Sequence, residues 1–125
     1  MANLSGWRVL LVEDEVDAQD VVVPLLDYHG MKVKTAFSGE EAMEILTHEK
    51  PDLVITDLAL PNMNGWELLA SMRSNPGLAD VPAVAITAYH STNVAQEAIQ
   101  AGFAAYFPKP ISARTFVEDL TSLFE

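Results

Sequence analysis

The sequence has 125 residues and no cysteine, which excludes a disulfide framework, a thiol nucleophile and a zinc site built from thiolates. It also lacks an apolar run long enough to cross a bilayer, and residues 1–12 do not have the charged-then-apolar layout of a signal peptide. We therefore expect a soluble, cytoplasmic protein with no membrane segment. The length suits one ordinary domain covering residues 1–125.

Basic residues are scarce. Seven Lys and Arg residues face eighteen Asp and Glu residues, which gives a formal net charge of −11. Such an acidic chain repels the phosphate backbone of nucleic acids, so we expect no direct nucleic-acid binding. The acidity indicates either simple solubility or a cation site, and only the positions of the acids can decide between these two readings.

Short apolar runs alternate with longer amphipathic segments along the chain. This alternation predicts an α/β domain with a parallel sheet covered on both faces, because parallel strands need crossover helices. Pro24 lies inside the first amphipathic segment and should kink that helix or end it early. The predicted strands are 7–12, 31–37, 52–56, 81–86 and 104–107, and the predicted helices are 15–29, 38–48, a segment from 64 to the turn at 75–77, 91–101 and 112–124.

Several local signals fix the ends of these helices. Ser38 with Glu41, and Asn64 with Glu67, have the spacing of capping boxes that open helices. Glycine follows the first and fourth predicted helices, where a helix is expected to stop. The last helix carries its apolar residues on one stripe, which comprises Phe116, Val117, Leu120, Leu123 and Phe124.

Polar residues stand where four of the predicted strands end. Glu13 and Asp14 follow the first strand, Asp57 the third and Thr87 the fourth, and the fifth runs into Lys109. The carboxyl ends of parallel strands lie on one edge of the sheet, which is where ligands bind in open α/β folds. The pattern therefore brings three carboxylates, a hydroxyl and an ammonium into one pocket.

Three carboxylates within about 4 Å of one another repel by roughly 1 to 4 kcal/mol per pair, depending on the local dielectric. A cation must offset this repulsion. Oxygen ligands without His or Cys suit Mg²⁺ or Mn²⁺, and Lys109 supplies a second positive charge. A carboxylate, a divalent cation, an amine and a hydroxyl together are typical of a phosphoryl-transfer site.

These motifs resemble the receiver domains of two-component response regulators. The resemblance rests on Glu13-Asp14, on Asp57-Leu-Ala-Leu-Pro-Asn-Met-Asn-Gly65, on Thr87-Ala88 and on Lys109-Pro110, all in the family's order. It covers essentially the whole chain. The resemblance implies a single (βα)5 domain with a doubly wound five-stranded parallel sheet, strand order 2-1-3-4-5, as in flavodoxin-like folds.

The resemblance also implies roles for the acidic residues and the lysine. Asp57 would be the phosphoacceptor, and Lys109 would contact the phosphoryl group. Glu13, Asp14 and Asp57 would hold the metal ion, with the backbone carbonyl of Ala59 as a further ligand.

A second set of implied roles concerns the switch. The Thr87 hydroxyl and the Ala88 amide would bind the phosphoryl group, and Tyr106 would turn inward after the threonine. Pro110 would follow a cis peptide bond. Such a chain catalyses only its own phosphorylation and dephosphorylation and is not otherwise an enzyme.

The implied partners are a histidine kinase or a histidine phosphotransfer protein, and a downstream protein or an output domain outside this chain. The signal would leave through the fourth helix, fifth strand and fifth helix, a face that is also compatible with a dimer. Four residues depart from the family pattern: Leu60 replaces the usual Met before Pro61, Asn64 replaces the usual Asp before Gly65, and Glu13 and Pro108 are the other two. Glu13 stands where Asp is more frequent, and Pro108 removes an amide from the last strand, which is tolerable only at a sheet edge.

Three other classes compete with this interpretation. A receiver-like binding module that takes no phosphate stays open because of Glu13 and Pro108. A phosphatase of the haloacid-dehalogenase type needs a second Asp two residues after the nucleophile, where this chain has Ala59. A flavin-binding module needs a phosphate-cradling loop after the first strand, where Glu13 and Asp14 would repel phosphate.

Overall fold

The alternation of strands and helices is realised in full in the computed structural model, which describes residues 3–89 and 91–125. The five strands are parallel and lie in the order β2-β1-β3-β4-β5, so the predicted α/β fold and strand order are confirmed. The elements are β1 (Arg8–Val12), α1 (Val16–Tyr28), β2 (Lys32–Ala36), α2 (Gly39–Leu46), β3 (Leu53–Asp57), α3 (Gly65–Ser74), β4 (Ala83–Thr87), α4 (Thr92–Ala101), β5 (Ala105–Pro108) and α5 (Phe116–Leu123).

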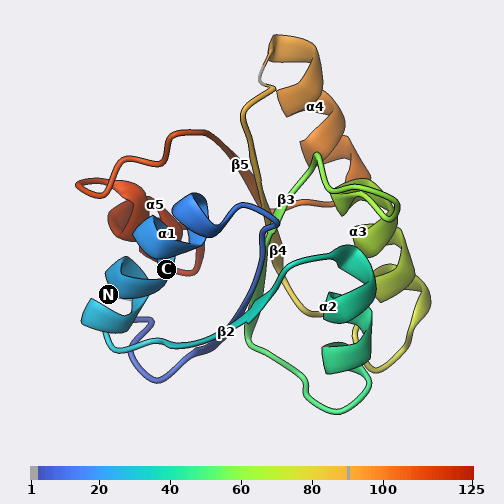
Figure 1. The fold of residues 1–125 in the computed structure, drawn as a ribbon, viewed down its shortest axis with the longest axis horizontal. Helices are drawn as coiled ribbons and strands as arrows, with labels where there is room; N and C mark the ends of the chain where they lie inside the picture. The colour runs from blue at the N-terminus through green and yellow to red at the C-terminus, as the bar shows by residue number, and fades with distance from the viewer. Residues whose placement is uncertain (1–2, 90) are drawn as a thin grey trace.

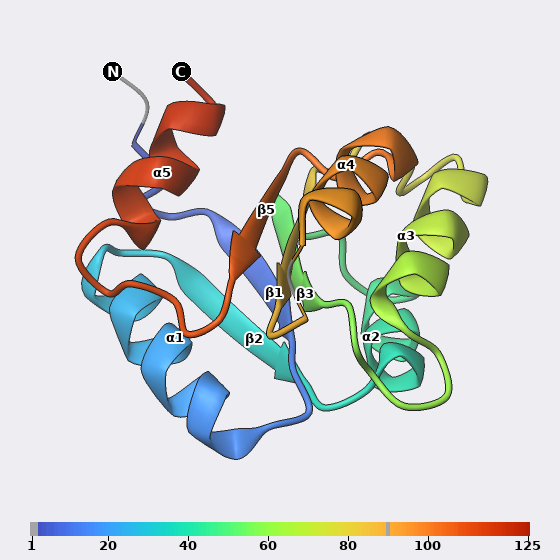
Figure 2. The same cartoon turned by 90° about the horizontal axis from the view of Figure 1, so that it is seen from above.

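Helices cover both faces of the sheet. Helices α1 and α5 lie on one face and α2, α3 and α4 on the other, in both views of the molecule (Figures 1 and 2). Every residue of β3 and β4 is buried, as expected for central strands with two covered faces. Two apolar clusters result, one under α1 and α5 around Leu26, Phe116 and Leu120, and one under α2 to α4 around Leu68 and Met72. None of the helices described is long and apolar enough to span a bilayer.

The helix starts follow the capping signals, with one difference. Asn64 and Glu67 exchange both bonds of a capping box, at 2.9 and 3.0 Å. Ser38 caps α2 by accepting from the Glu41 amide, but the Glu41 carboxylate accepts from the amide of Phe37 instead of that of Ser38. The capping box predicted at Ser38 and Glu41 is therefore only half formed, because the Glu41 side chain bonds to the residue before the cap.

The early helix end expected at Pro24 as an alternative to a kink is wrong, because helix α1 continues to Tyr28. The kink stays a prediction. Pro24 is exposed, so water can satisfy the carbonyl that loses its partner.

The expected start of the last helix is also wrong. Helix α5 begins at Phe116 and not at residue 112. The preceding residues 112–115 are exposed and form a turn, in which the Thr115 and Phe116 amides both donate to the Ser112 carbonyl. Leu123, expected on the buried stripe, is 38% exposed.

Pro108 lies in β5, which is an edge strand, so its missing amide costs the central sheet no hydrogen bond. Gly65 has a different structural role, at the start of α3. A Cβ on this residue would lie 2.5 Å from the backbone oxygen of Asp57, closer than packing allows. The Gly65 amide also donates to the Leu58 carbonyl at 3.1 Å. The absence of a side chain at Gly65 therefore lets α3 begin directly against the end of β3.

Candidate functional site

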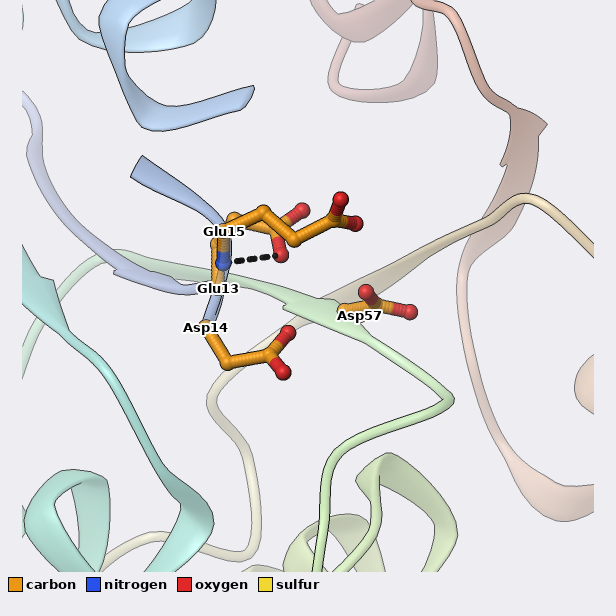
Figure 3. A group of neighbouring side chains, drawn as sticks. All are labelled: Glu13, Asp14, Glu15 and Asp57. Atoms are coloured by element: carbon orange, nitrogen blue, oxygen red, sulfur yellow. Dashed lines mark hydrogen bonds between the residues drawn. The ribbon is translucent and has the colours of Figure 1, made fainter. Parts of the chain in front are cut away.

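The acidic residues singled out in the sequence meet at the carboxyl ends of β1 and β3. These two strands are neighbours at the point where the strand order reverses, which is the usual ligand-binding position in doubly wound sheets. Asp57 is the last residue of β3 and Glu13 directly follows β1. One carboxylate oxygen each from Glu13, Asp14, Glu15 and Asp57 lie within 4.8 Å of one another (Figure 3).

The four acids differ in exposure. Glu13 and Asp57 are buried, at 0% and 3% exposure, whereas Asp14 and Glu15 are exposed. Glu15 is a member that the sequence argument missed, although its position next to Glu13 and Asp14 was a signal. The Glu15 amide donates to Glu13 Oε2 at 3.1 Å, the dashed line in Figure 3. Gln19, also missed, donates its buried Nε2 to the Glu13 carbonyl at 2.7 Å and so fixes this turn.

Lys109 lies at the centre of this cluster. Its Nζ is 2.8 Å from Asp57 Oδ2 and 3.2 Å from Glu15 Oε1, and it also contacts Glu13 Oε1. The lysine side chain is only 13% exposed. The structure thus brings together Glu13, Asp14, Asp57 and Lys109, residues that are far apart in the sequence and that the strand ends were expected to unite.

The electrostatics of the site are unbalanced. Burial raises the pKa of the Glu13 carboxyl to about 7, and the nearby charge of Asp57 adds to this, while hydrogen bonds from Lys109 and the Glu15 amide act in the opposite direction. Burial alone would lower the pKa of Lys109, but its hydrogen bonds to Asp57 and Glu13 outweigh that effect, and its pKa is raised. One ammonium faces four carboxylates, so the cluster holds an excess of negative charge.

The donor set fits a divalent cation. All of the clustered ligand atoms are carboxylate oxygens, which suits Mg²⁺ or Mn²⁺ and argues against zinc or copper. Glu13 Oε1 is buried, and among the described residues the Lys109 ammonium is the one cation that pairs with it. A buried carboxylate oxygen with spare lone pairs is an available metal ligand. The carbonyl of Ala59 stays a predicted ligand; its amide donates to Asp57 Oδ1 at 2.9 Å.

The predicted switch residues occupy the neighbouring strands. Thr87 is the buried last residue of β4, and its Oγ1 accepts from the Tyr89 amide at 3.0 Å, with exposed Ala88 between them. Tyr106, in β5, packs against the cluster under α2 to α4. Its hydroxyl is buried and has no hydrogen-bond partner among the residues described. The Lys109–Pro110 bond, for which the resemblance implies a cis geometry, is cis.

An apolar groove opens beside the lysine. It has a volume of about 490 Å³ and lies between α1 and the segment that follows β5. Ala18 and Val21 line it from α1 and Ile111 from the other side, with Glu15 and Lys109 where the groove meets the acidic cluster. We refer to it as the α1 groove. Val21 is 50% exposed, so an approaching protein could contact it.

This fold and this site are those of a receiver domain, and sequence comparison agrees. The family described as "Response regulator receiver domain" matches residues 9–121, and the chain belongs to that family. As a member of it, the chain is a phosphorylatable switch of two-component signalling. Nothing in the comparisons supports the phosphatase interpretation.

Individual relatives cover most of the chain. The polar-differentiation response regulator DivK of Brucella ovis is 30% identical over 114 residues, which are 91% of this chain and 93% of the relative. The chemotaxis response regulator CheY4 of Vibrio cholerae superposes with a TM-score of 0.88 at 26% identity, covering 95% of this chain and 99% of CheY4. A putative response regulator from Chloroflexus aurantiacus gives a TM-score of 0.89, also at 26% identity, with 95% and 98% covered.

Proposed function

We propose that Asp57 of this receiver domain accepts a phosphoryl group from a histidine kinase or a histidine phosphotransfer protein. The observation that carries this proposal is the 2.8 Å contact between Lys109 Nζ and Asp57 Oδ2 inside the acidic cluster. Catalysis of phosphoryl transfer consists mainly of positioning and charge neutralisation, and these groups are placed for both. The chemistry would be confined to the chain's own acceptor.

In the proposed step, a carboxylate oxygen of Asp57 attacks the phosphorus of a phosphohistidine. The new O–P bond forms as the N–P bond breaks, and the electron pair stays on the donor's imidazole nitrogen, which takes up a proton from water. The Ala59 amide orients the acceptor through Asp57 Oδ1. Lys109, already paired with Oδ2, would transfer its contact to the incoming phosphoryl oxygens.

Glu13, Asp14 and Asp57 would hold Mg²⁺ or Mn²⁺, with the Ala59 carbonyl as a further ligand. When bound, the ion would neutralise charge on the phosphoryl oxygens. Glu15 lies close enough to the other acids to contribute, either to the ion or by keeping Lys109 in place through their 3.2 Å contact.

The conformational response would run through Thr87 and Tyr106. A phosphoryl group carries strong acceptor oxygens, and these favour conformations in which the Thr87 hydroxyl donates to them. Moving a population from 1:99 to 99:1 requires about 5.5 kcal/mol of preference. A single hydrogen bond to a charged group supplies roughly 1.5–3 kcal/mol, which is less than this. Unless Lys109, the metal ion and repacking supply the remainder, only part of the population changes conformation. We propose a partial switch.

The partners would use different faces. A phosphodonor would dock in the α1 groove, which is the apolar surface that adjoins Lys109. The signal would leave through α4, β5 and α5, where Ile99 of α4 is 53% exposed and Tyr106 of β5 packs against the apolar cluster under α2 to α4. The receiver of the signal would be a downstream protein or an output domain outside this chain, and the same face could form a dimer.

The test is the incorporation of phosphate from acetyl phosphate, measured by intact mass with and without Mg²⁺. We expect one phosphoryl group on the unmodified chain with Mg²⁺ and none on Asp57→Asn. Asp20→Asn, the same chemical change at an exposed position of α1, should label normally. Labelling that persists in Asp57→Asn would identify a different acceptor. An unmodified chain that never labels would favour the phosphorylation-independent binding module.

A further inference from the structure

A second groove lies at the opposite end of the sheet from Asp57. It has a volume of about 160 Å³ and is formed by the beginnings of β1 and β2 and by the segment between α2 and β3. Its apolar lining includes Leu10, Val33, Ile45 and Pro51. We refer to it as the basic groove, because of the side chains around it.

Four of the seven basic residues of this acidic chain surround that groove. They are Arg8, Lys32, Lys34 and Lys50, and the only acid among the lining residues is Glu49. Arg8 and Lys32 are register partners at the starts of neighbouring strands. Two further acids adjoin these cations: Asp52 Oδ2 accepts from the Arg8 backbone amide at 2.8 Å, and Asp80 pairs with Lys50. Four cations therefore face three acids, which leaves a local net positive charge on a chain whose net charge is −11.

The four cations are not equally engaged. Lys34 pairs with Glu49 at 2.6 Å and Lys50 with Asp80 at 3.0 Å. The Arg8 guanidinium donates to the Lys50 carbonyl at 2.9 Å, which orients it without neutralising it. Within the described part of the chain, no carboxylate comes within 4.0 Å of the charged side-chain nitrogens of Arg8 or Lys32.

Protection of a sheet edge explains only part of this pattern. Lysines on an edge strand discourage pairing with other chains, and Lys32 and Lys34 lie on the edge strand β2. Arg8, however, is on the interior strand β1, and Lys50 is in a loop. Neither residue protects an edge, yet both line the basic groove.

We propose that the basic groove binds an acidic peptide segment of a partner protein, with one apolar side chain in the hollow and carboxylates on Arg8 and Lys32. Pockets for cofactors and drug-sized ligands measure about 300–1,000 Å³, so about 160 Å³ suits a single side chain better. Charge complementarity fixes the place of binding, because an acidic segment is repelled by most of this chain's surface and attracted here.

The position of the groove has a functional consequence. It lies at the amino ends of the strands, whereas the acidic cluster lies at their carboxyl ends, so both can be occupied at once. The bound segment would tether the receiver domain to a partner whether or not Asp57 carries phosphate. This inference does not depend on the phosphoacceptor role of Asp57.

The experiment follows amide resonances of the full ¹⁵N-labelled chain during titration with the blocked peptide Asp-Glu-Leu-Asp-Glu. The same peptide with Asn and Gln in place of the acids is the ligand control. We expect shifts at Arg8, Lys32 and Val33 with the acidic peptide only, and weaker binding as salt is added.

Charge reversal in Lys32→Glu should weaken binding about tenfold or more, because like charges across an interface are strongly unfavourable. Arg114→Glu makes the same change at an exposed residue outside the groove and should bind within about twofold of the parent chain. Arg8→Gln, which removes one charge, provides a second variant should Lys32→Glu disturb the fold. Phosphate labelling should be unchanged in all three variants.

Three results would overturn the proposal. The first is equal weakening by Lys32→Glu and Arg114→Glu, which would mean diffuse charge attraction. The second is a set of shifts centred elsewhere, such as on α4 and β5. The third is a shift in the amide resonances of the groove residues when only the protein concentration is raised. A second copy of this chain would then be the occupant.

Discussion

The two ends of the sheet carry charges of opposite sign, which are largely buried at one end and largely exposed at the other. At the carboxyl ends, Glu13 and Asp57 are buried and outnumber the single ammonium of Lys109. At the amino ends, Lys34 and Lys50 are largely exposed and each pairs with one acid. Buried charge without a full set of counter-charges is costly, whereas exposed ion pairs contribute little. Perturbing the first end should therefore change chemistry and stability, and perturbing the second should change neither.

The largest expected effect at the carboxyl end comes from Lys109→Gln. Gln keeps a hydrogen-bond donor near Asp57 but removes the positive charge that offsets the phosphoryl oxygens. Loss of one electrostatic group of this kind typically slows catalysis by about 10²–10³-fold. Rates of labelling by acetyl phosphate at saturating Mg²⁺ measure the effect. An unchanged rate would remove Lys109 from the mechanism, and Lys50→Gln, at the other end of the sheet, should label at the parent rate.

The next effect concerns pH and Glu13. The folded-state pKa of about 7 lies above the ordinary value of 4.5, so the folded chain holds this proton where the unfolded chain has lost it. Stability without Mg²⁺ should therefore fall as pH rises from about 5 to about 8, by at most a few kcal/mol. Glu13→Gln, which cannot ionise, should lose this part of the slope and be more stable than the parent at pH 8.

Urea unfolding at the two pH values measures the change, with the exposed Glu118→Gln as the control. Because Mg²⁺ binds the ionised carboxylate, its stabilising effect on the parent chain should be larger at about pH 8 than at about pH 6. A parent slope that Glu13→Gln leaves intact would place the titrating group elsewhere.

A smaller effect is expected from Thr87→Ala. The variant keeps Asp57, Lys109 and the acidic cluster, so it should still label. It loses a hydrogen bond to the phosphoryl group worth roughly 1.5–3 kcal/mol, so the shift of population on labelling should shrink. The readout is the change in amide resonances of β5 between unlabelled and labelled chain. A full response in Thr87→Ala, equal to that of the exposed control Thr92→Ala, would contradict the proposed path.

The smallest effect is expected at the amino end, from Lys34→Met. This change breaks the 2.6 Å pair with Glu49, whose pKa is lowered chiefly by the hydrogen bond from Lys34. Both side chains are exposed to screening solvent, so the unfolding midpoint should stay within the scatter of replicate measurements. A loss of stability as large as that of a core substitution would contradict the expected difference between the two ends of the sheet.

The sequence predicted the parts of this structure that depend on local pattern. Four of the strand ends were predictable because apolar runs stop at or shortly before polar residues, and the meeting of Glu13, Asp57 and Lys109 follows from parallel topology. The start of α5 was not predictable, because Ser112 has the chemistry of a helix cap, yet the backbone forms a turn at residues 113–115 and the helix begins at Phe116. Tolerance of Pro24 depends on its exposure.

Parts of the site needed three-dimensional geometry. Glu15 could have pointed into solvent, and only the turn after β1 brings its carboxylate to Lys109. Gln19 gave no signal at all, since a glutamine on an amphipathic helix is ordinarily a solvated residue; its bond to the Glu13 carbonyl depends on how α1 packs. Among the described residues the buried hydroxyl of Tyr106 has no hydrogen-bond partner, and this too depends on packing and not on sequence pattern.

The close approach at Gly65 places the first turn of α3 in direct contact with the backbone of the acceptor, Asp57. Because α3 begins against the backbone of Asp57, the chain leaves the acceptor, turns and returns to it within one closed loop. A displacement of the Asp57 backbone must push on the first turn of α3, and a side chain at residue 65 would wedge the two apart. Insertions into residues 58–64 should therefore disturb the acceptor's position, whereas the exposed loop at residues 47–50 can tolerate changes in length.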